Sequence, residues 1–181
     1  SKIYNIKSIK KLNKKLKKVI YSDFKKIVKK KFLKKINFSN PPILMGVINI
    51  TPDSFSDGGK YNKKIKAFQH AKYLINKGCK IIDIGGESTR PGAKDLDEKV
   101  EWQRVSGALK KIKKLNKLIS IDTRKGLVME NAIKNKVNII NDVSGLKYDI
   151  KTIQILKKTK IPFVIHHMQG SPLTMQKKPK Y

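Results

Sequence analysis

From residue 43 onward, short apolar runs alternate with longer segments of helical periodicity. The runs are rich in β-branched residues and apolar at consecutive positions, which is typical of strands buried on both faces. They predict strands at 43–49, 80–84, 118–122, 137–141 and 161–166. Between them, apolar residues at helical spacing predict helices at 63–77, 97–115, 125–135 and 149–159. Because parallel strands need a crossover connection, this alternation predicts an α/β fold with a parallel sheet.

The first 38 residues follow a different pattern. They hold 15 lysines and a single acid, Asp23. Apolar residues at near-helical spacing predict two short amphipathic helices, the second of them capped by Ser22 and Asp23. Asn40-Pro41-Pro42 then marks a boundary. We therefore expect a lysine-rich, helical N-terminal extension at 1–40 and an α/β domain at 41–181.

Each predicted strand ends in polar residues. In chain order these are Asn49, the run from Gly85 to Arg90, Asp122-Thr123-Arg124, Asn141-Asp142 and His166-His167. The glycine-rich phosphate loop that usually follows the first strand of a nucleotide-binding sheet is absent, so a (β/α)₈ barrel is favoured over an open sheet. Such a barrel needs about 250 residues. We therefore expect only about the first five βα units here, and a chain that is inactive when isolated.

The formal charge of +30 changes this picture little. Forty of the 43 basic residues are lysine, and lysine is abundant along the whole chain. Nucleic-acid sites normally use more arginine, so we interpret the charge as compositional bias and keep a lysine-rich nucleic-acid-binding module as an alternative. The single cysteine, Cys79, cannot form an internal disulfide, and no signal-peptide core is visible. These features favour a reducing, cytoplasmic location.

Candidate chemistry gathers at the strand ends. Six of the thirteen acids lie there or in the loops that follow: Asp53, Asp57, Asp83, Glu87, Asp122 and Asp142. Carboxylates and amides at one barrel mouth suit a planar heterocycle with several N–H donors. Arg90, with the hydroxyls of Ser88 and Thr89, suits a phosphate group. Asn49 offers a neutral oxygen that could hold Mg²⁺.

Other interpretations of these residues remain open. Asp122 and Asn141 could cap the helices that follow them, and Thr123 is expected to do so. Arg90 could form an ion pair with Glu87, and Arg124 could contact phosphate or add only surface charge. Adjacent strand residues point to opposite faces, so at most one of His166 and His167 faces the site.

Two long segments, 45–59 (MGVINITPDSFSDGG) and 83–92 (DIGGESTRPG), resemble dihydropteroate synthases. Shorter matches follow in the same order at 121–123, 139–142, 167–170 and 174–176. The resemblance implies a (β/α)₈ pterin-binding barrel that joins 6-hydroxymethyl-7,8-dihydropterin diphosphate to p-aminobenzoate in folate biosynthesis. It also implies a Mg²⁺ cofactor and a homodimer at full length. A related pterin-barrel methyltransferase is disfavoured by the loop at 51–59.

The resemblance also assigns roles to residues. Asp122 and Asn141 would hold the pterin ring, and Asn49 would contribute to the Mg²⁺–pyrophosphate site. Thr89 and Arg90 would lie near the diphosphate and the aminobenzoate. Asp53, Ser54 and Phe55 would form a loop that closes over the site. Pro91 would line the aminobenzoate pocket, where sulfonamides compete. Pyrophosphate would leave before the aryl amine attacks.

Overall fold

The computed structural model describes residues 12–28, 42–51, 60–88 and 93–166. It divides into two compact units, Ser1–Phe38 and Ser39–Tyr181, and each is treated by itself. Several residues named above lie outside the described ranges, so their roles stay predictions: Asp53, Ser54, Phe55, Asp57, Thr89, Arg90, Pro91 and His167.

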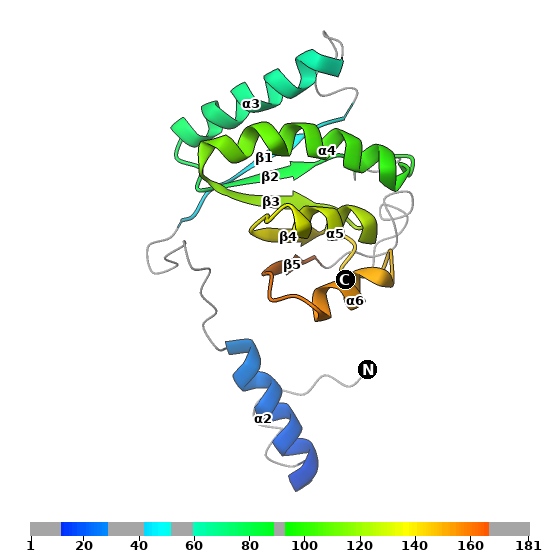
Figure 1. Ribbon diagram of the computed structural model, residues 1–181. Coiled ribbons are helices and arrows are strands. Elements are labelled where there is room, and N and C mark those ends of the chain that lie inside the picture. The colour runs from blue at the N-terminus through cyan, green and yellow to red at the C-terminus, as the bar shows by residue number, and fades with distance from the viewer. Residues whose placement is uncertain (1–11, 29–41, 52–59, 89–92, 167–181) are drawn as a thin grey trace. The chain divides into compact units, whose positions relative to one another are not determined.

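The second unit contains one five-stranded sheet in which every neighbouring pair is parallel. Its strands are β1 (Met45–Asn49), β2 (Ile81–Gly85), β3 (Leu118–Asp122), β4 (Ile139–Asp142) and β5 (Phe163–Ile165). Their order in space is their order in the chain (Figure 1). A doubly wound sheet reverses its strand order at a switch point, whereas a barrel does not. The predicted α/β fold with five βα units of a barrel is therefore confirmed.

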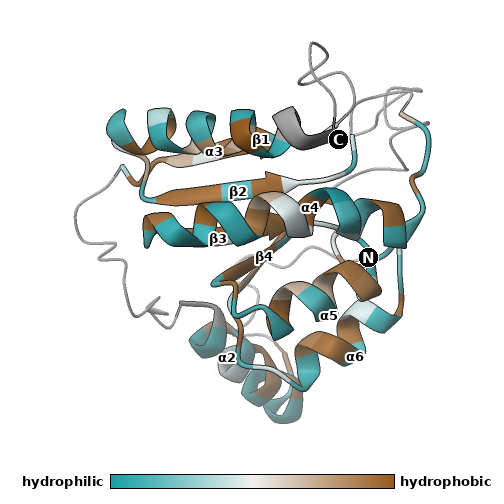
Figure 2. Ribbon diagram, turned by 45° about the horizontal axis from the view of Figure 1, so that its top comes forward, coloured by the Kyte–Doolittle hydropathy of each residue, from teal (hydrophilic) through white to brown (hydrophobic). Residues whose placement is uncertain are grey.

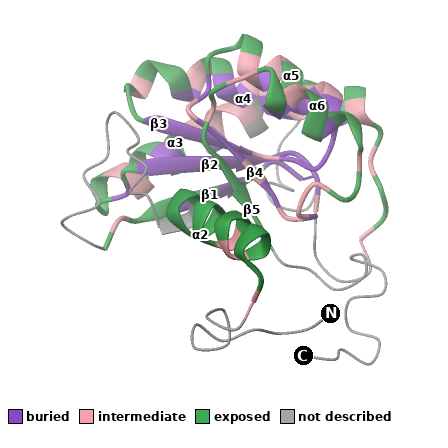
Figure 3. Ribbon diagram, turned by 90° about the horizontal axis from the view of Figure 1, so that it is seen from below, coloured by how far each residue is buried: buried purple, intermediate pink, exposed green. Residues whose placement is uncertain are grey.

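Helices connect successive strands, as predicted. They are α3 (Lys60–Asn76), α4 (Glu98–Ile112) with the 3₁₀ turn η2 (Lys113–Leu115), α5 (Gly126–Lys134) and α6 (Lys151–Lys157). Asp97 begins α4 as its N-cap, because its carboxylate accepts hydrogen bonds from the amides of Lys99 and Val100. These helices lie along one face of the sheet (Figures 1 and 3).

The hydrophobic core lies between that face and the helices. Alternate strand residues point into it, among them Ile48, Ile82, Ile84, Ile119, Ile121 and Ile140. Figure 2 shows the apolar character concentrated on the strands. Cys79 is buried in this core. Because these residues point into the core, the residues that alternate with them point to the opposite face of the sheet.

The opposite face of the sheet carries the intervening strand residues. In β1 these are Met45, Val47 and Asn49, all exposed, whereas Gly46 and Ile48 between them are buried. All three residues of β5 are exposed. The prediction that every strand is buried on both faces is therefore wrong for β1 and β5, the two edge strands of the sheet. Asn49 on this face is exposed, whereas Asp83 and Ser120, further back along the strands, are buried.

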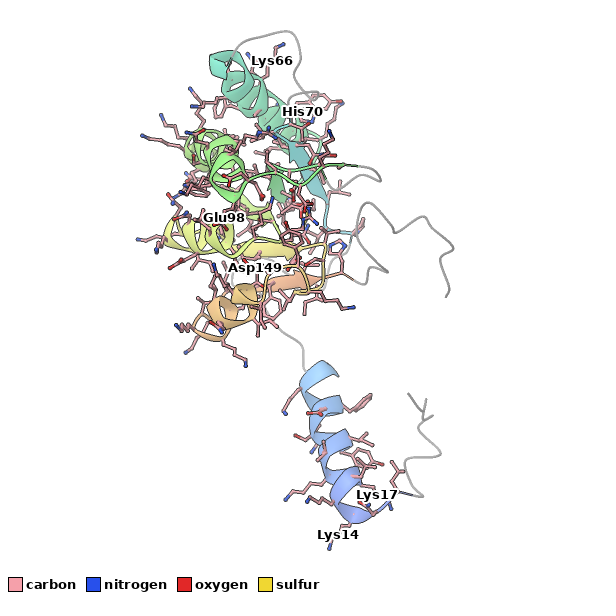
Figure 4. The ribbon with its side chains drawn as sticks, turned by 90° about the vertical axis from the view of Figure 1, so that its right-hand side faces the viewer. Lys14, Lys17, Lys66, His70, Glu98 and Asp149 are labelled. Carbon is pink, nitrogen blue, oxygen red and sulfur yellow. The ribbon has the colours of Figure 1, made fainter. Side chains whose placement is uncertain are left out.

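In the first unit, helix α2 runs without a break over Lys14–Val28. The predicted helix start at Ser22-Asp23 is therefore wrong. Asn13 caps α2 instead, since its side-chain oxygen accepts a hydrogen bond from the amide of Leu16 at 2.9 Å. Asp23 stays in the helix because its side chain is exposed and pairs with Lys26. Lys14 and Lys17 project from its first turn (Figure 4).

No helix in the described ranges is both long enough and apolar enough to span a bilayer.

Candidate functional site

The carboxyl ends of four strands bring polar side chains into one row. Asn49 pairs with Gly85, Gly85 with Asp122, and Asp122 with Asn141. Directly paired residues of parallel strands point to the same side of the sheet. This side faces away from the helices. The sequence prediction that Asn49, Asp122 and Asn141 meet at one end of the sheet is therefore supported by the register.

Gly85 lets two of these side chains approach each other. A Cβ atom built on Gly85 would lie 3.2 Å from Oδ1 of Asn49 and 3.6 Å from Oδ2 of Asp122. The missing side chain thus leaves the space that the amide and the carboxylate occupy. The side-chain oxygens of Asn49 and Asp122, both hydrogen-bond acceptors, therefore approach each other above Gly85.

Asp83 belongs to the same face, one row further back on β2. Nδ2 of Asn141 donates to Oδ2 of Asp83 at 3.0 Å. Oδ1 of Asn141 lies 2.8 Å from Nε2 of His166, so the imidazole donates at this contact. His166 is thereby placed at the site; His167 lies outside the described residues, so the prediction that at most one of the two faces the site stays a prediction.

Among the residues that the structure describes, no cation pairs with the carboxylates of Asp83 and Asp122 on this polar face. Oδ1 of Asp83, Oδ1 of Asp122 and Oγ of Ser120 are buried, and none has a hydrogen-bond partner within the described residues. Burial raises the pKa of Asp122 to about 7, and the negative charges of Asp83, Glu101, Asp142 and Glu87 add to the increase. Unpaired buried oxygens cost free energy unless a ligand supplies donors. The arrangement suits a ligand with several N–H groups.

A second set of acids, fully paired with cations, lies immediately beside this face. We call it the ionic cluster and define it as Glu87, Asp95, Glu101, Arg124 and Lys125. Nζ of Lys125 lies 2.7 Å from Oε1 of Glu87 and 2.8 Å from Oε2 of Glu101. Nε of Arg124 lies 2.9 Å from Oε2 of Glu87, and its NH2 lies 2.6 Å from Oδ1 of Asp95. The cluster joins the end of β2 to α4 and to the end of β3.

The two buried glutamates of the cluster differ in their pKa shifts. Burial alone would raise the pKa of Glu87, but hydrogen bonds from Arg124 and Lys125 outweigh burial and lower it. For Glu101 burial dominates and raises the pKa, although Lys125 and Thr123 donate to its carboxylate. The pKa of Lys125 rises because its bonds to both glutamates outweigh its burial. The lysine therefore stays charged.

Gly86 lets β2 approach helix α4 closely. A Cβ atom there would lie 2.9 Å from Cγ2 of Val105 and 3.0 Å from the backbone oxygen of Glu101. The carbonyl oxygen of Gly86 accepts a hydrogen bond from Arg104. A side chain at Gly86 would therefore push β2 away from α4.

The expectation that Thr123 caps the helix after it holds in part. Its hydroxyl oxygen accepts a hydrogen bond from the backbone amide of Lys125, the residue before α5, at 3.2 Å, and the same hydroxyl donates to Oε1 of Glu101 at 2.7 Å. The first amide of α5 itself, that of Gly126, needs another acceptor. Asp149 serves that purpose, since its Oδ2 accepts from the amide of Gly126 at 2.8 Å (Figure 4). Arg124 is not surface charge, because it is only 3% exposed.

Sequence reasoning missed Lys125 and Glu101 altogether. Lys125 is 4% exposed and Glu101 is fully buried. Forty lysines give no individual signal, and Glu101 stands in an amphipathic helix where acids are common. The only usable signal was the position of Lys125, three residues beyond the polar end of a strand.

The oxygens of Asn49 and Asp122 are donors of the type that Mg²⁺ prefers, and Mg²⁺ needs few protein ligands because it keeps waters or substrate phosphates. Within the described ranges, His, Cys, Asp and Glu form no group of three or more able to hold a metal by themselves. The residues present therefore fit a magnesium ion shared with a substrate phosphate.

Comparison with known proteins places this site in a family. Residues 45–181 match the family described as pterin binding enzyme. Dihydropteroate synthase of Escherichia coli K12 is 45% identical over 141 residues, which are 77% of this chain and 50% of the relative. The chain thus spans about half the length of that curated relative. The chain belongs to the pterin-binding enzyme family.

Two solved structures show the same likeness in three dimensions. A Yersinia pestis dihydropteroate synthase in complex with a sulfonamide drug has a TM-score of 0.72 and 39% identity, covering 81% of this chain and 53% of that one. A Burkholderia cenocepacia dihydropteroate synthase complexed with 7,8-dihydropteroate has a TM-score of 0.67 and 33% identity, covering 81% of this chain and 48% of that one.

Proposed function

We propose that this protein acts in folate biosynthesis as a dihydropteroate synthase. It condenses 6-hydroxymethyl-7,8-dihydropterin diphosphate with p-aminobenzoate and releases pyrophosphate. One observation carries the proposal: buried oxygens of Asp83 and Asp122 have no hydrogen-bond partner among the described residues, on the face that also holds Asn49 and Asn141. Family membership and the dihydropteroate bound to the Burkholderia relative support it.

The pterin ring is the ligand that this polar face suits. Its ring N–H and amino groups are donors, and the free oxygens of Asp83 and Asp122 are acceptors. Asn141 offers both kinds of group, and its orientation is set by Asp83 on one side and His166 on the other. An ionised Asp122 accepts the ring donors best, so binding of the pterin lowers its pKa from about 7.

In the reaction, the bond between the pterin methylene carbon and the diphosphate oxygen breaks, and its electron pair leaves with pyrophosphate. The amine nitrogen of p-aminobenzoate then forms the new C–N bond and loses a proton. Fixed carboxylates beside the ring stabilise the positive charge that develops on the pterin. Thr89 and Arg90 would position the diphosphate and the aminobenzoate, with Pro91 lining the pocket of the latter.

Asn49 would hold Mg²⁺ together with the substrate diphosphate, and the ion would offset the charge of the leaving group. The segment with Asp53, Ser54 and Phe55 would cover the bound substrates. A cytoplasmic location and a homodimer complete the proposal.

The test is an assay on the protein made from its natural reading frame. We expect pyrophosphate and 7,8-dihydropteroate in equal amounts when both substrates are present, with neither product when p-aminobenzoate is omitted. Asp122→Ala and Arg90→Ala should each lower kcat/KM by about 100-fold or more. Lys134→Met removes a lysine that is 65% exposed and paired at the surface, and should leave kcat/KM unchanged. Absence of dihydropteroate from the unaltered protein contradicts the proposal.

A further inference from the structure

Lys125 is exceptional among the lysines of this chain. Of those that the structure describes, it is the one that is buried, with 4% of its surface exposed. A lysine normally keeps its ammonium group in water and buries only its methylene stem. Here the ammonium group itself is enclosed, between the carboxylates of Glu87 and Glu101.

Lys125 and Arg124 bind the carboxylates that flank one chain segment. Glu87 stands before the segment 88–94, and its Oε1 accepts from Lys125 and also from the backbone amide of Leu96 at 2.8 Å. Asp95 stands after the segment and pairs with Arg124, which also pairs with Glu87. Arg124 therefore binds both flanking carboxylates, whereas Lys125 binds Glu87 and acts on the far end of 88–94 through the hydrogen bond from Leu96 to Glu87.

The ring of Tyr148 completes this arrangement from the loop after β4. Its centroid lies 4.0 Å from Cζ of Arg124, and its hydroxyl donates to Oδ2 of Asp95 at 3.2 Å. Arg124 is thus restrained by a carboxylate on each side and by an aromatic face. Three loops that follow neighbouring strands are tied together at this point.

Stability alone does not require such a cluster. Apolar side chains of similar volume stabilise a buried position as well as an ion pair does or better. What paired charges add is one defined geometry, because each carboxylate oxygen has a specific donor. The segment whose ends they define carries Thr89, Arg90 and Pro91, the residues assigned above to the diphosphate and the aminobenzoate.

We propose, on the basis of the function proposed above, that Lys125 is a positioning residue for the aminobenzoate half of the reaction, acting through Glu87 and the two ends of segment 88–94. It does not touch substrate. The pterin ring is held by strand residues, so its binding depends little on this lysine.

Lys125→Met tests the assignment in the protein made from its natural reading frame. We expect the KM for p-aminobenzoate to rise tenfold or more, while the dissociation constant for 6-hydroxymethylpterin, which lacks the diphosphate, changes less than threefold. Glu87→Gln keeps the shape of the side chain and should raise the same KM by a smaller factor. Lys134→Met is the matched control, because Lys134 pairs with Glu130 on the surface, and its KM should stay at the natural value.

If KM for p-aminobenzoate rises, kcat falls and pterin affinity falls all by the same factor, Lys125 is merely structural and the assignment is overturned. If Lys125→Met does not fold, Glu87→Gln alone decides, and an unchanged KM in it has the same consequence. If the unaltered protein makes no dihydropteroate, the proposed function fails, and amide exchange at Leu96 still tests the contacts. Exchange there should be tenfold faster in Lys125→Met or Glu87→Gln and unchanged in Lys134→Met; equal rates in all variants would overturn the proposal.

Discussion

Two pairs of acids near the carboxyl ends of β2 and β3 lie in opposite electrostatic settings. Glu87 and Glu101, on the helix side, share Lys125, and Glu87 also binds Arg124. Asp83 and Asp122, on the other face, have free oxygens and no cation within the described residues. A fold that needed only stability would pair or remove the second set. The difference indicates that the ionic cluster is scaffold and that the polar face is kept open for a ligand.

The largest effect should come from breaking the paired side. Lys125→Met leaves the buried Glu101 without its cation and Glu87 with Arg124 alone, and removal of one partner from a buried pair costs about 3–5 kcal/mol of unfolding free energy. Lys134→Met, which breaks an exposed pair, should cost less than about 1 kcal/mol. Urea unfolding of both variants measures the difference. Equal losses would mean that the cluster does not stabilise the fold.

The unpaired carboxylate of Asp122 should make the stability of the fold fall as the pH rises. The pKa of Asp122 is raised to about 7 in the folded chain, above its value in the unfolded chain, so folding favours the protonated form. Its contribution to stability is complete at low pH and is lost as the pH rises through about 7. Asp122→Asn removes this loss and should therefore gain about 2–4 kcal/mol over the natural chain between pH 4 and pH 8.

Unfolding midpoints of the natural chain and of Asp122→Asn across this pH range provide the measurement. Asp23→Asn, a change at an exposed carboxylate in α2, serves as the control and should leave the pH profile unaltered. Parallel profiles for the natural chain and Asp122→Asn would show that the carboxyl of Asp122 is not held in its protonated form.

A smaller effect is expected at the junction between the two sides. Gly86→Ala places a Cβ against Val105 and the backbone of Glu101 and should cost about 1–3 kcal/mol. Gly107→Ala, in the middle of α4, meets only the flexible end of the Lys64 side chain and should stabilise by up to about 1 kcal/mol through helix propensity. Thermal unfolding distinguishes the two signs. An unchanged unfolding temperature in Gly86→Ala would contradict the inference that β2 and α4 approach each other closely at this glycine.

The polar face could be predicted from the sequence because its logic is local. A strand of a parallel sheet is recognisable from its apolar run, and the residue where the run stops is the residue at the strand end. Asn49, Asp122 and Asn141 follow from that rule and from the parallel order. The helix break at Ser22-Asp23 failed because capping residues are tolerated inside a helix when they are exposed.

The ionic cluster could not be predicted in this way because it depends on tertiary contacts. Glu87 and Lys125 are 38 positions apart in the sequence, and Glu101 comes from a helix between them. Nothing local distinguishes Lys125 from the other lysines. Its burial follows only from the packing of α4 against the ends of β2 and β3.

The most direct test of this contrast is calorimetric titration of Asp122→Asn with 6-hydroxymethylpterin at pH 8, beside thermal unfolding of the same variant. The account predicts at least a 100-fold loss of pterin affinity together with a higher unfolding midpoint than that of the natural chain. Unchanged pterin affinity would contradict the claim that the unpaired carboxylates are held for a ligand at the expense of stability. A lower unfolding midpoint in Asp122→Asn would contradict it too.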